Sequence, residues 1–409
     1  MRKNGINREL VPIDGGVCAP KGFQASGIYC GILPPSYLEN GAPREDLGLI
    51  VGDNRYPTAC VYTSGGLAGA PVRVCKKHCT LGLARAVIVN SGIANMFGEN
   101  GETQAENITR AVARKLQTSA DEILIASTGK TNEPFPFDLI VNSIDELAKN
   151  LGYASENSLA AARAMMTTDR YPKQISYSFY IGDYSCKIGA IFKGSNHVSP
   201  NMATTLCFLT TDVNITTEML QRALRSAVND TFNMLNIDGV SSPNDTVCII
   251  TSRKAENYRI SSVDSEYQKF EYALKETLFK ICVQIAADGA FSQKAIVYHV
   301  RGAKSKASAR VIAKTLAGSI GLKKSLNQDY VSLNDVLCAM NGGEESTDVS
   351  RLQLTVSSKE KSLVLVESGE FLAYSKENLS SVLMGEDVSL TLDFQDGNYA
   401  ARSIGCDLV

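Results

Sequence analysis

Short apolar runs alternate with amphipathic stretches along most of this chain, and this alternation is its strongest constraint on fold. Four of the apolar runs end in polar turn residues and have the pattern of buried strands. They are Arg85–Asn90, Glu122–Ser127, Leu206–Thr210 and Thr246–Thr251. Four longer stretches carry apolar residues at helical spacing. They are Glu102–Gln117, Ser158–Met166, Thr217–Leu235 and Tyr267–Ala287. The alternation predicts a mixed α/β (α+β) protein, a sandwich of sheets and helices.

Three further segments predict antiparallel hairpins. They are Tyr177–Phe192 around Gly182-Asp183, Leu352–Val356 with Ser362–Val366, and Val388–Phe394 with Ala400–Cys406. The last two follow a change of texture near residue 300, where a short helix over Ala309–Leu316 is also expected. Because 409 residues are many for a single core, we expect a catalytic core over residues 1–300 and a smaller C-terminal α/β domain over 301–409.

Charge and composition limit the partners that the chain can have. The 41 basic and 43 acidic residues almost cancel, and no block of like charge suggests nucleic-acid or membrane binding. The first residues lack the apolar stretch of a signal peptide, and no apolar run reaches membrane-spanning length, so we expect neither feature. The eleven cysteines follow no disulfide framework, which is typical of the reducing cytoplasm. We therefore expect a cytoplasmic protein that acts on small molecules.

Several common catalytic chemistries lack their sequence signatures. The three histidines lie near no nucleophile motif, so a histidine triad is not predicted. Cys75, His78 and Cys79 lack the second ligand pair of a zinc site, and we interpret them as a surface turn with ordinary thiols and expect no metal. Gly65–Gly69 lacks the spacing of a phosphate-binding loop. The remaining candidates are hydroxyl nucleophiles that do not belong to a histidine triad.

The segment from Lys193 to Leu206 is the best place for such a nucleophile. A loop of small and polar residues, Gly194–Ala203, leads into an apolar strand at Thr204 and Thr205. Two threonines before a strand are, by their type alone, ordinary β-branched strand residues. The residues by themselves leave both interpretations open.

A family resemblance favours the catalytic interpretation. Six motifs occur in the order found in the ornithine acetyltransferases, also called glutamate N-acetyltransferases of arginine biosynthesis. They are Ala19–Phe23, Asn90–Asn95, Ala126–Gly129, Met166–Asp169, Lys193-Gly194 with Pro200–Thr204, and Asn244–Thr246. Together they span residues 17 to 300, so the chain resembles this family over most of its length.

The resemblance implies a self-cleaving enzyme. The bond between Ala203 and Thr204 would be cut, giving chains 1–203 and 204–409, and Thr204 would be the nucleophile. Its new α-amino group, with an ordinary pKa near 8, can serve as the general base. Thr128 and Gly129 match the family's oxyanion pair, and Thr167 and Lys193 match substrate-binding positions.

The same resemblance implies the reaction and the assembly. An acetyl group would move from an N-acetylated amino acid of the N-acetylornithine type to glutamate through an acyl-threonine. No cofactor is expected, with acetyl-CoA as an alternative acetyl donor. The assembly would be a heterotetramer of two α and two β chains.

Three departures from the family pattern keep alternatives open. Ala290 stands where the family has a glutamate that contacts the substrate amine, so ornithine binding should weaken. Asn327–Asn334 stands in place of a tryptophan-containing stretch, and the family's closing tail would follow Val409. The alternatives are an amidohydrolase or aminopeptidase acting on another N-acyl substrate, and an inactive binding subunit.

Overall fold

The structure is a computed structural model that describes residues 9–39, 41–98, 100–195, 205–289, 292, 294–343 and 348–408. The chain divides into two compact units. The first comprises residues 1–193, 204–228 and 242–277, and the second comprises residues 194–203, 229–241 and 278–409. The boundary expected at residue 300 falls within strand β12 (Ala295–Ala303).

A mixed sheet forms the centre of the first unit. Its described strands, in spatial order, are β1 (Val11–Pro12), β8 (Lys173–Ile181), β9 (Tyr184–Lys193), β10 (Leu206–Thr211), β11 (Thr246–Thr251), β5 (Leu47–Tyr62), β6 (Leu83–Asn90) and β7 (Ile123–Ser127). Strand β2 (Phe23–Ile28) pairs with the first half of β5. β3 (Leu38–Glu39) and β4 (Ala42–Pro43) form a separate small ribbon.

Strand β10 is a central strand of this sheet, and all six of its residues are buried. It runs parallel to β11 and antiparallel to β9. In this register Leu206 is paired with Lys193 on one side and with Thr246 on the other. The start of β10 therefore lies beside the end of β9, where Lys193 is the last strand residue.

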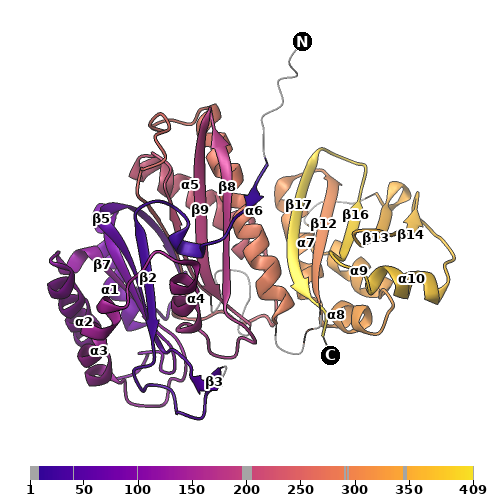
Figure 1. The fold of residues 1–409 in the computed structure, drawn as a ribbon. Coiled ribbons are helices and arrows are strands. Elements are labelled where there is room, and N and C mark those ends of the chain that lie inside the picture. Colours follow the sequence, from indigo (N-terminus) through magenta and orange to yellow (C-terminus); the bar gives the residue numbers. More distant parts are fainter. Residues whose placement is uncertain are drawn as a thin grey trace. The chain divides into compact units, whose positions relative to one another are not determined.

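Six helices begin in the described residues of the first unit: α1 (Ala70–His78), α2 (Gly101–Leu116), α3 (Phe137–Lys149), α4 (Ser155–Arg163), α5 (Thr217–Asp230) and α6 (Ser265–Ala287). Helix α2 connects the parallel strands β6 and β7, and α5 connects the parallel strands β10 and β11. Helices α1 and α2 contact β7, whereas α4 contacts β2, β5, β8 and β9 (Figure 1). No described helix has the length and apolar character needed to cross a membrane.

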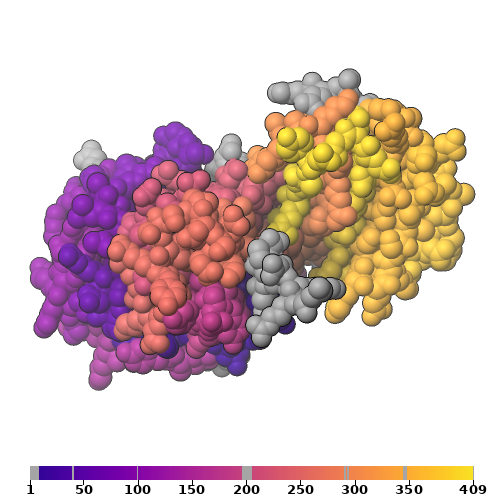
Figure 2. Space-filling model, turned by 90° about the horizontal axis from the view of Figure 1, so that it is seen from above, coloured from indigo at the N-terminus to yellow at the C-terminus, as the bar shows by residue number. Residues whose placement is uncertain are grey.

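The second unit contains its own mixed sheet and core. The described strands, in spatial order, are β15 (Glu370–Phe371), β14 (Ser362–Glu367), β13 (Gln353–Ser357), β16 (Ser389–Asp393), β12 and β17 (Tyr399–Cys406). Its helices are α7 (Lys306–Gly318), α8 (Ile320–Asn327), α9 (Leu333–Met340) and α10 (Lys376–Leu383). Residues 295–343 and 348–408 are drawn in orange to yellow in the space-filling view (Figure 2).

The mixed α/β class is confirmed, and so are two of the three hairpins. β8 pairs with β9, and β13 pairs with β14. The third hairpin was wrong, because β12 lies between β16 and β17. Strand β12 pairs in parallel with β16 along one edge and antiparallel with β17 along the other. The five residues between β16 and β17 are enough to cross the roughly 10 Å that two strand spacings require.

Two helix boundaries also differ from those predicted. The helix expected over Thr217–Leu235 ends at Asp230, because Thr231 leaves the helical conformation, and a 3-10 turn over Phe232–Met234 follows. Asn, Asp and Thr are weak helix formers, which accounts for the stop. Helix α4 begins at Ser155 rather than Ser158, because the side chain of Asn157 accepts the N–H of Ala154 and closes the helix start.

Candidate active site

Lys193 is the centre of a buried polar cluster in the first unit. It is the last residue of β9, and only 3% of it is exposed. Its Nζ donates hydrogen bonds to Thr167 Oγ1 at 2.7 Å and to Thr128 Oγ1 at 3.3 Å. The structure therefore brings together three of the residues expected in the site. Burial lowers the pKa of the Lys193 ammonium below its ordinary value, against the opposing effect of Asp169.

The buried carboxylate of Asp169 lies close to two lysines, Lys173 and Lys193. Its Oδ1 lies 2.8 Å from Lys173 Nζ, whereas its Oδ2 lies 3.8 Å from Lys193 Nζ. The N–H of Thr167 donates to Asp169 Oδ2 at 3.1 Å. Lys173 is thus the closer partner of Asp169, which leaves Lys193 hydrogen-bonded to hydroxyl groups. The guanidinium of Arg44 donates to the carbonyl of Met166 at 2.8 Å and adds a third positive charge nearby.

The loop after β7 presents Thr128 and Gly129. The N–H of Thr128 donates to Asn90 O at 3.0 Å, and the N–H of Lys130 donates to Gly92 O at 2.8 Å. Between them, the N–H of Gly129 has no acceptor within the described residues. Gly129 has a φ of 130°, and an added Cβ would overlap the carbonyl group of Gly92. The loop therefore needs glycine here and holds one N–H beside one hydroxyl.

The side chain of Asn244 joins this loop to the neighbouring segment. Its Nδ2 donates to Ala94 O at 2.8 Å and to Ser127 O at 3.1 Å. A single amide thus fixes the end of β7 against the loop that follows β6. Because these bonds are buried, they keep the Thr128–Gly129 turn in place.

Thr204 and Ala203, the expected nucleophile and cleavage site, lie outside the described residues, and the described chain resumes at Thr205. The N–H of Thr205 donates to Asp245 Oδ1 at 2.7 Å, and its carbonyl accepts the N–H of Thr246 at 3.1 Å. Thr205 Oγ1 is buried and has no hydrogen-bond partner in the described part of the chain. The backbone that follows Thr204 is thus fixed on both sides.

The two cysteines and the histidine that were interpreted as a surface turn make structural contacts. Cys75 belongs to α1 rather than to a surface turn, and its Sγ donates to Ile125 O at 3.0 Å. Cys79 Sγ lies 3.2 Å from Cys60 Sγ. Within the described residues no cluster of three metal-ligating side chains occurs. His78 Nδ1 contacts Ile123 O at 2.8 Å.

Two of the three departures, Ala290 and Val409, are among the residues that the structure does not describe. The third, Asn327–Asn334, lies in the second unit. Asn327 ends α8, and its Nδ2 donates to Asp407 Oδ2 at 3.1 Å. Ser332 caps α9 through the N–H of Asp335. Asn327 and Ser332 of this stretch thus make structural contacts within the second unit.

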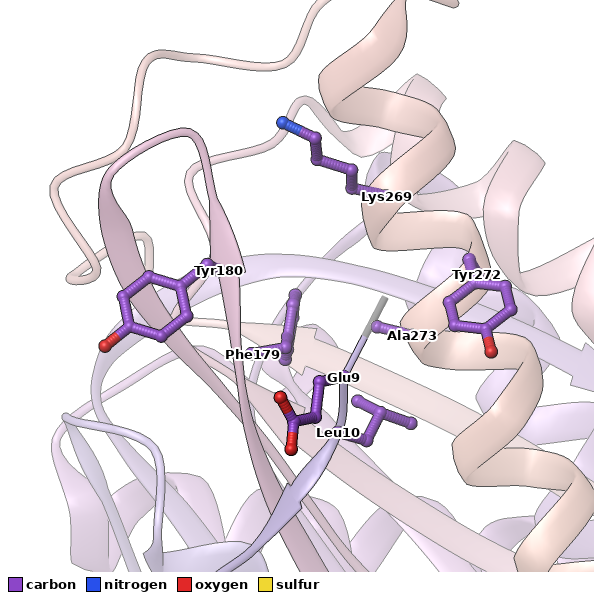
Figure 3. Close-up of a pocket in the computed structure, with 7 residues that line it drawn as sticks. All are labelled: Glu9, Leu10, Phe179, Tyr180, Lys269, Tyr272 and Ala273. Atoms are coloured by element: carbon purple, nitrogen blue, oxygen red, sulfur yellow. The ribbon is translucent and has the colours of Figure 1, made fainter. Parts of the chain in front are cut away.

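Two surface hollows occur among the described residues, each within one unit. One is lined by Glu9 and Leu10, by Phe179 and Tyr180 of β8, and by Lys269, Tyr272 and Ala273 of α6 (Figure 3). It is too small to enclose an amino acid. The other is an open hollow in the second unit, beside Tyr330, Phe371 and Tyr374. Neither includes an expected site residue.

Sequence reasoning missed three members of the polar network: Lys173, Arg44 and Asp245. Lys173 begins a strand and is followed by Gln174, which is typical of a surface lysine. Asp245 lies between Asn244 and Thr246 in one of the six motifs, and this position was the available signal.

Comparisons with known proteins identify the family of this chain. The ArgJ family model matches residues 24–409. The arginine biosynthesis bifunctional protein ArgJ of Caldanaerobacter subterraneus subsp. tengcongensis is 30% identical over 397 residues, with 97% of this chain and 96% of the relative covered. The glutamate N-acetyltransferase of Methanopyrus kandleri is 34% identical, with 92% and 96% covered.

Among solved structures, ArgJ of Bacillus halodurans is 31% identical, with a TM-score of 0.44 and with 48% of this chain and 98% of that chain covered. The match of the family model over almost the whole chain, together with relatives at 30% identity or more over nearly full length, settles the assignment. The chain belongs to the ArgJ family of acyltransferases.

Proposed function

We propose that this chain is a self-processing N-terminal-threonine acyltransferase, which moves an acetyl group from an N-acetylated amino acid of the N-acetylornithine type to glutamate. One observation carries the proposal. Lys193 Nζ bonds to the hydroxyls of both Thr128 and Thr167, and its strand is in register with the strand that continues from Thr204.

The first step is self-cleavage. Thr204 Oγ attacks the carbonyl carbon of Ala203, the C–N bond breaks, and the nitrogen of Thr204 takes up a proton. Water then hydrolyses the resulting ester, giving chains 1–203 and 204–409. The new α-amine has an ordinary pKa near 8, so a useful fraction is neutral near pH 7 and can accept the proton of Thr204 Oγ. This explains how the chain acts without a catalytic histidine.

Acetyl transfer uses the same hydroxyl twice. Thr204 Oγ attacks the acetyl carbonyl, the donor amine leaves with a proton, and acetyl-threonine forms. The amine of glutamate then attacks this ester and releases Thr204. Both steps pass through an oxyanion that Thr128 Oγ–H and Gly129 N–H can stabilise, each donor contributing about 3–4 kcal/mol. Because Lys193 donates to Thr128 Oγ1, the hydroxyl hydrogen of Thr128 is free to point to the substrate.

The charges of the cluster favour an anionic substrate. Three basic side chains, Lys193, Lys173 and Arg44, gather around the buried carboxyl group of Asp169. An excess of positive charge in a buried site binds a carboxylate strongly. Lys193 therefore has the right charge and position to hold the α-carboxylate of an amino acid.

The first experiment measures cleavage and transfer in the full chain. Denaturing electrophoresis of the wild type should give two fragments of similar size, whereas Thr204→Ala should remain one chain of 409 residues. Thr80→Ala, at an exposed threonine of the same unit, serves as the control and should cleave normally. An uncut wild type would refute the proposed function and favour an inactive binding subunit.

A second experiment identifies the substrate. Purified, cleaved enzyme is given N-acetylornithine and glutamate, and the appearance of N-acetylglutamate is followed. A parallel reaction with acetyl-CoA tests the alternative donor. Hydrolysis of N-acyl amino acids without transfer to glutamate would instead assign an amidohydrolase. Light scattering of the cleaved protein tests the expected heterotetramer of two α and two β chains.

A further inference from the structure

Asp245 is a fully buried carboxyl group, 0% exposed, directly before β11. Oδ1 accepts the N–H of Thr205 at 2.7 Å, and Oδ2 accepts the N–H of Ser242 at 3.3 Å. Within the described residues no lysine or arginine forms an ion pair with it. Burying a carboxyl group without an ion pair is costly. The presence of Asp245 at this buried position therefore needs an explanation.

The position of Asp245 supplies this explanation. The N–H of Thr205 belongs to the peptide bond that joins Thr204 to Thr205, so Asp245 fixes that peptide from one side. The carbonyl of Thr205 is fixed from the other side by the N–H of Thr246. Before cleavage the chain also restrains Thr204 through Ala203. Afterwards its only covalent connection is through Thr205, so these two bonds become more important.

We propose that Asp245 is a positioning residue that holds the 204–205 peptide, so that Thr204 keeps its attacking geometry during self-cleavage and afterwards as a free N-terminus. This inference rests on the proposed function. Rates of attack are very sensitive to placement, because a displacement of about 1 Å can slow a reaction roughly 100-fold. Asp245 touches neither the substrate nor the acetyl group in this account and acts through Thr205.

The opposite end of β10 offers a matched control. Asp212 follows the strand, is 2% exposed, and accepts the N–H of Lys187 at 2.7 Å and that of Lys21 at 3.5 Å. Burial raises its pKa, as it does for Asp245. The two carboxyl groups are thus both buried, and each accepts two backbone N–H groups. They lie near opposite ends of a strand whose six residues span about 17 Å, and only Asp245 bonds to Thr205, the residue that follows Thr204 in the sequence.

The experiment compares Asp245→Ala, Asp245→Asn and Asp212→Asn with the wild type. Alanine keeps neither hydrogen bond, whereas asparagine keeps one, because its amide nitrogen cannot accept an N–H. The fraction of uncut chain is followed with time on denaturing gels, and urea unfolding measures stability. Cleavage should slow by roughly 10- to 100-fold in Asp245→Ala, by less in Asp245→Asn, and not measurably in Asp212→Asn.

Kinetics of the cleaved enzyme separate positioning from a general structural effect. After long incubation, cleaved Asp245→Asn should show a lower kcat with the KM for the acetyl donor unchanged, because substrate binding uses Lys193. Wild-type cleavage rates in both Asp245 variants, or an equal slowing in Asp212→Asn, would overturn the inference. If Asp245→Ala does not fold, Asp245→Asn decides alone. A wild type that never cleaves would instead remove the proposed function itself.

Discussion

Replacing Lys193 by methionine tests the role of the central lysine. The substitution keeps most of the side-chain volume and removes the charge and the hydrogen bonds to Thr167 and Thr128. Asp169 retains its closer partner, Lys173, at 2.8 Å, so this buried carboxylate stays paired. We therefore expect Lys193→Met to fold with a free energy of unfolding close to that of the wild type.

The effect on catalysis should be much larger. A hydrogen bond to a charged group is worth about 1.5–3 kcal/mol, so loss of one bond from Lys193 to the substrate carboxylate should lower kcat/KM by roughly 10- to 150-fold. Most of this loss should appear as a higher KM. Thr128 also loses its orienting donor, which should lower kcat.

The assay is acetyl transfer by cleaved enzyme over a range of donor concentrations, with urea unfolding as the stability measurement. Lys187→Met, on the same strand and only partly buried, is the control and should keep wild-type kcat/KM. If Lys193→Met is folded and retains wild-type KM, the assignment of Lys193 to the substrate carboxylate is refuted.

Three further predictions follow from the site. Gly129→Ala should lose acetyl transfer and lower the melting temperature, because its φ of 130° strains any L side chain by about 1–3 kcal/mol and the Cβ meets Gly92; an active, stable variant would contradict the described loop. Thr205→Val should raise the free energy of unfolding in urea by about 1 kcal/mol, because it removes a buried hydroxyl without a partner; destabilisation would show that this hydroxyl is bonded. Burial lowers the pKa of Lys193, so kcat/KM should fall with rising pH before the ordinary lysine pKa near 10.4 is reached. Between the lowered pKa and the ordinary one, the folded state binds fewer protons than the unfolded state, so the contribution of Lys193 to stability rises with pH. Lys193→Arg should lack this decline in kcat/KM, and an unchanged pH profile would assign it to another group.

Local patterns were enough to predict much of the fold. β10 and β11 are short apolar runs whose residues are all buried, and such runs are recognisable without tertiary information. The β8–β9 hairpin has a glycine with positive φ at Gly182, the turn signal on which the prediction depended. The order of β16, β12 and β17 was not predictable in this way, because a five-residue connection fits a hairpin as well as a crossing over one strand.

Family motifs were enough to single out three candidate residues that the structure places in contact. Thr128, Thr167 and Lys193 come from three separate segments, and the structure brings them together. The buried ion pair of Lys173 with Asp169 could not be predicted, because an aspartate and a lysine four residues apart ordinarily form a solvated surface pair. It is buried here because tertiary packing encloses both residues. The contact between Asp245 and Thr205 also depends on how β10 and β11 align, which single residues do not reveal.

Mass spectrometry of the intact protein tests the central claim most directly. The purified wild type should contain two polypeptides, one of which begins at Thr204, and N-acetylornithine should add one acetyl group to that polypeptide at its first residue. Thr204→Ala should show one uncut chain and no added acetyl group. A wild type that transfers acetyl to glutamate while remaining uncut, or that carries the acetyl group on another residue, would contradict the account.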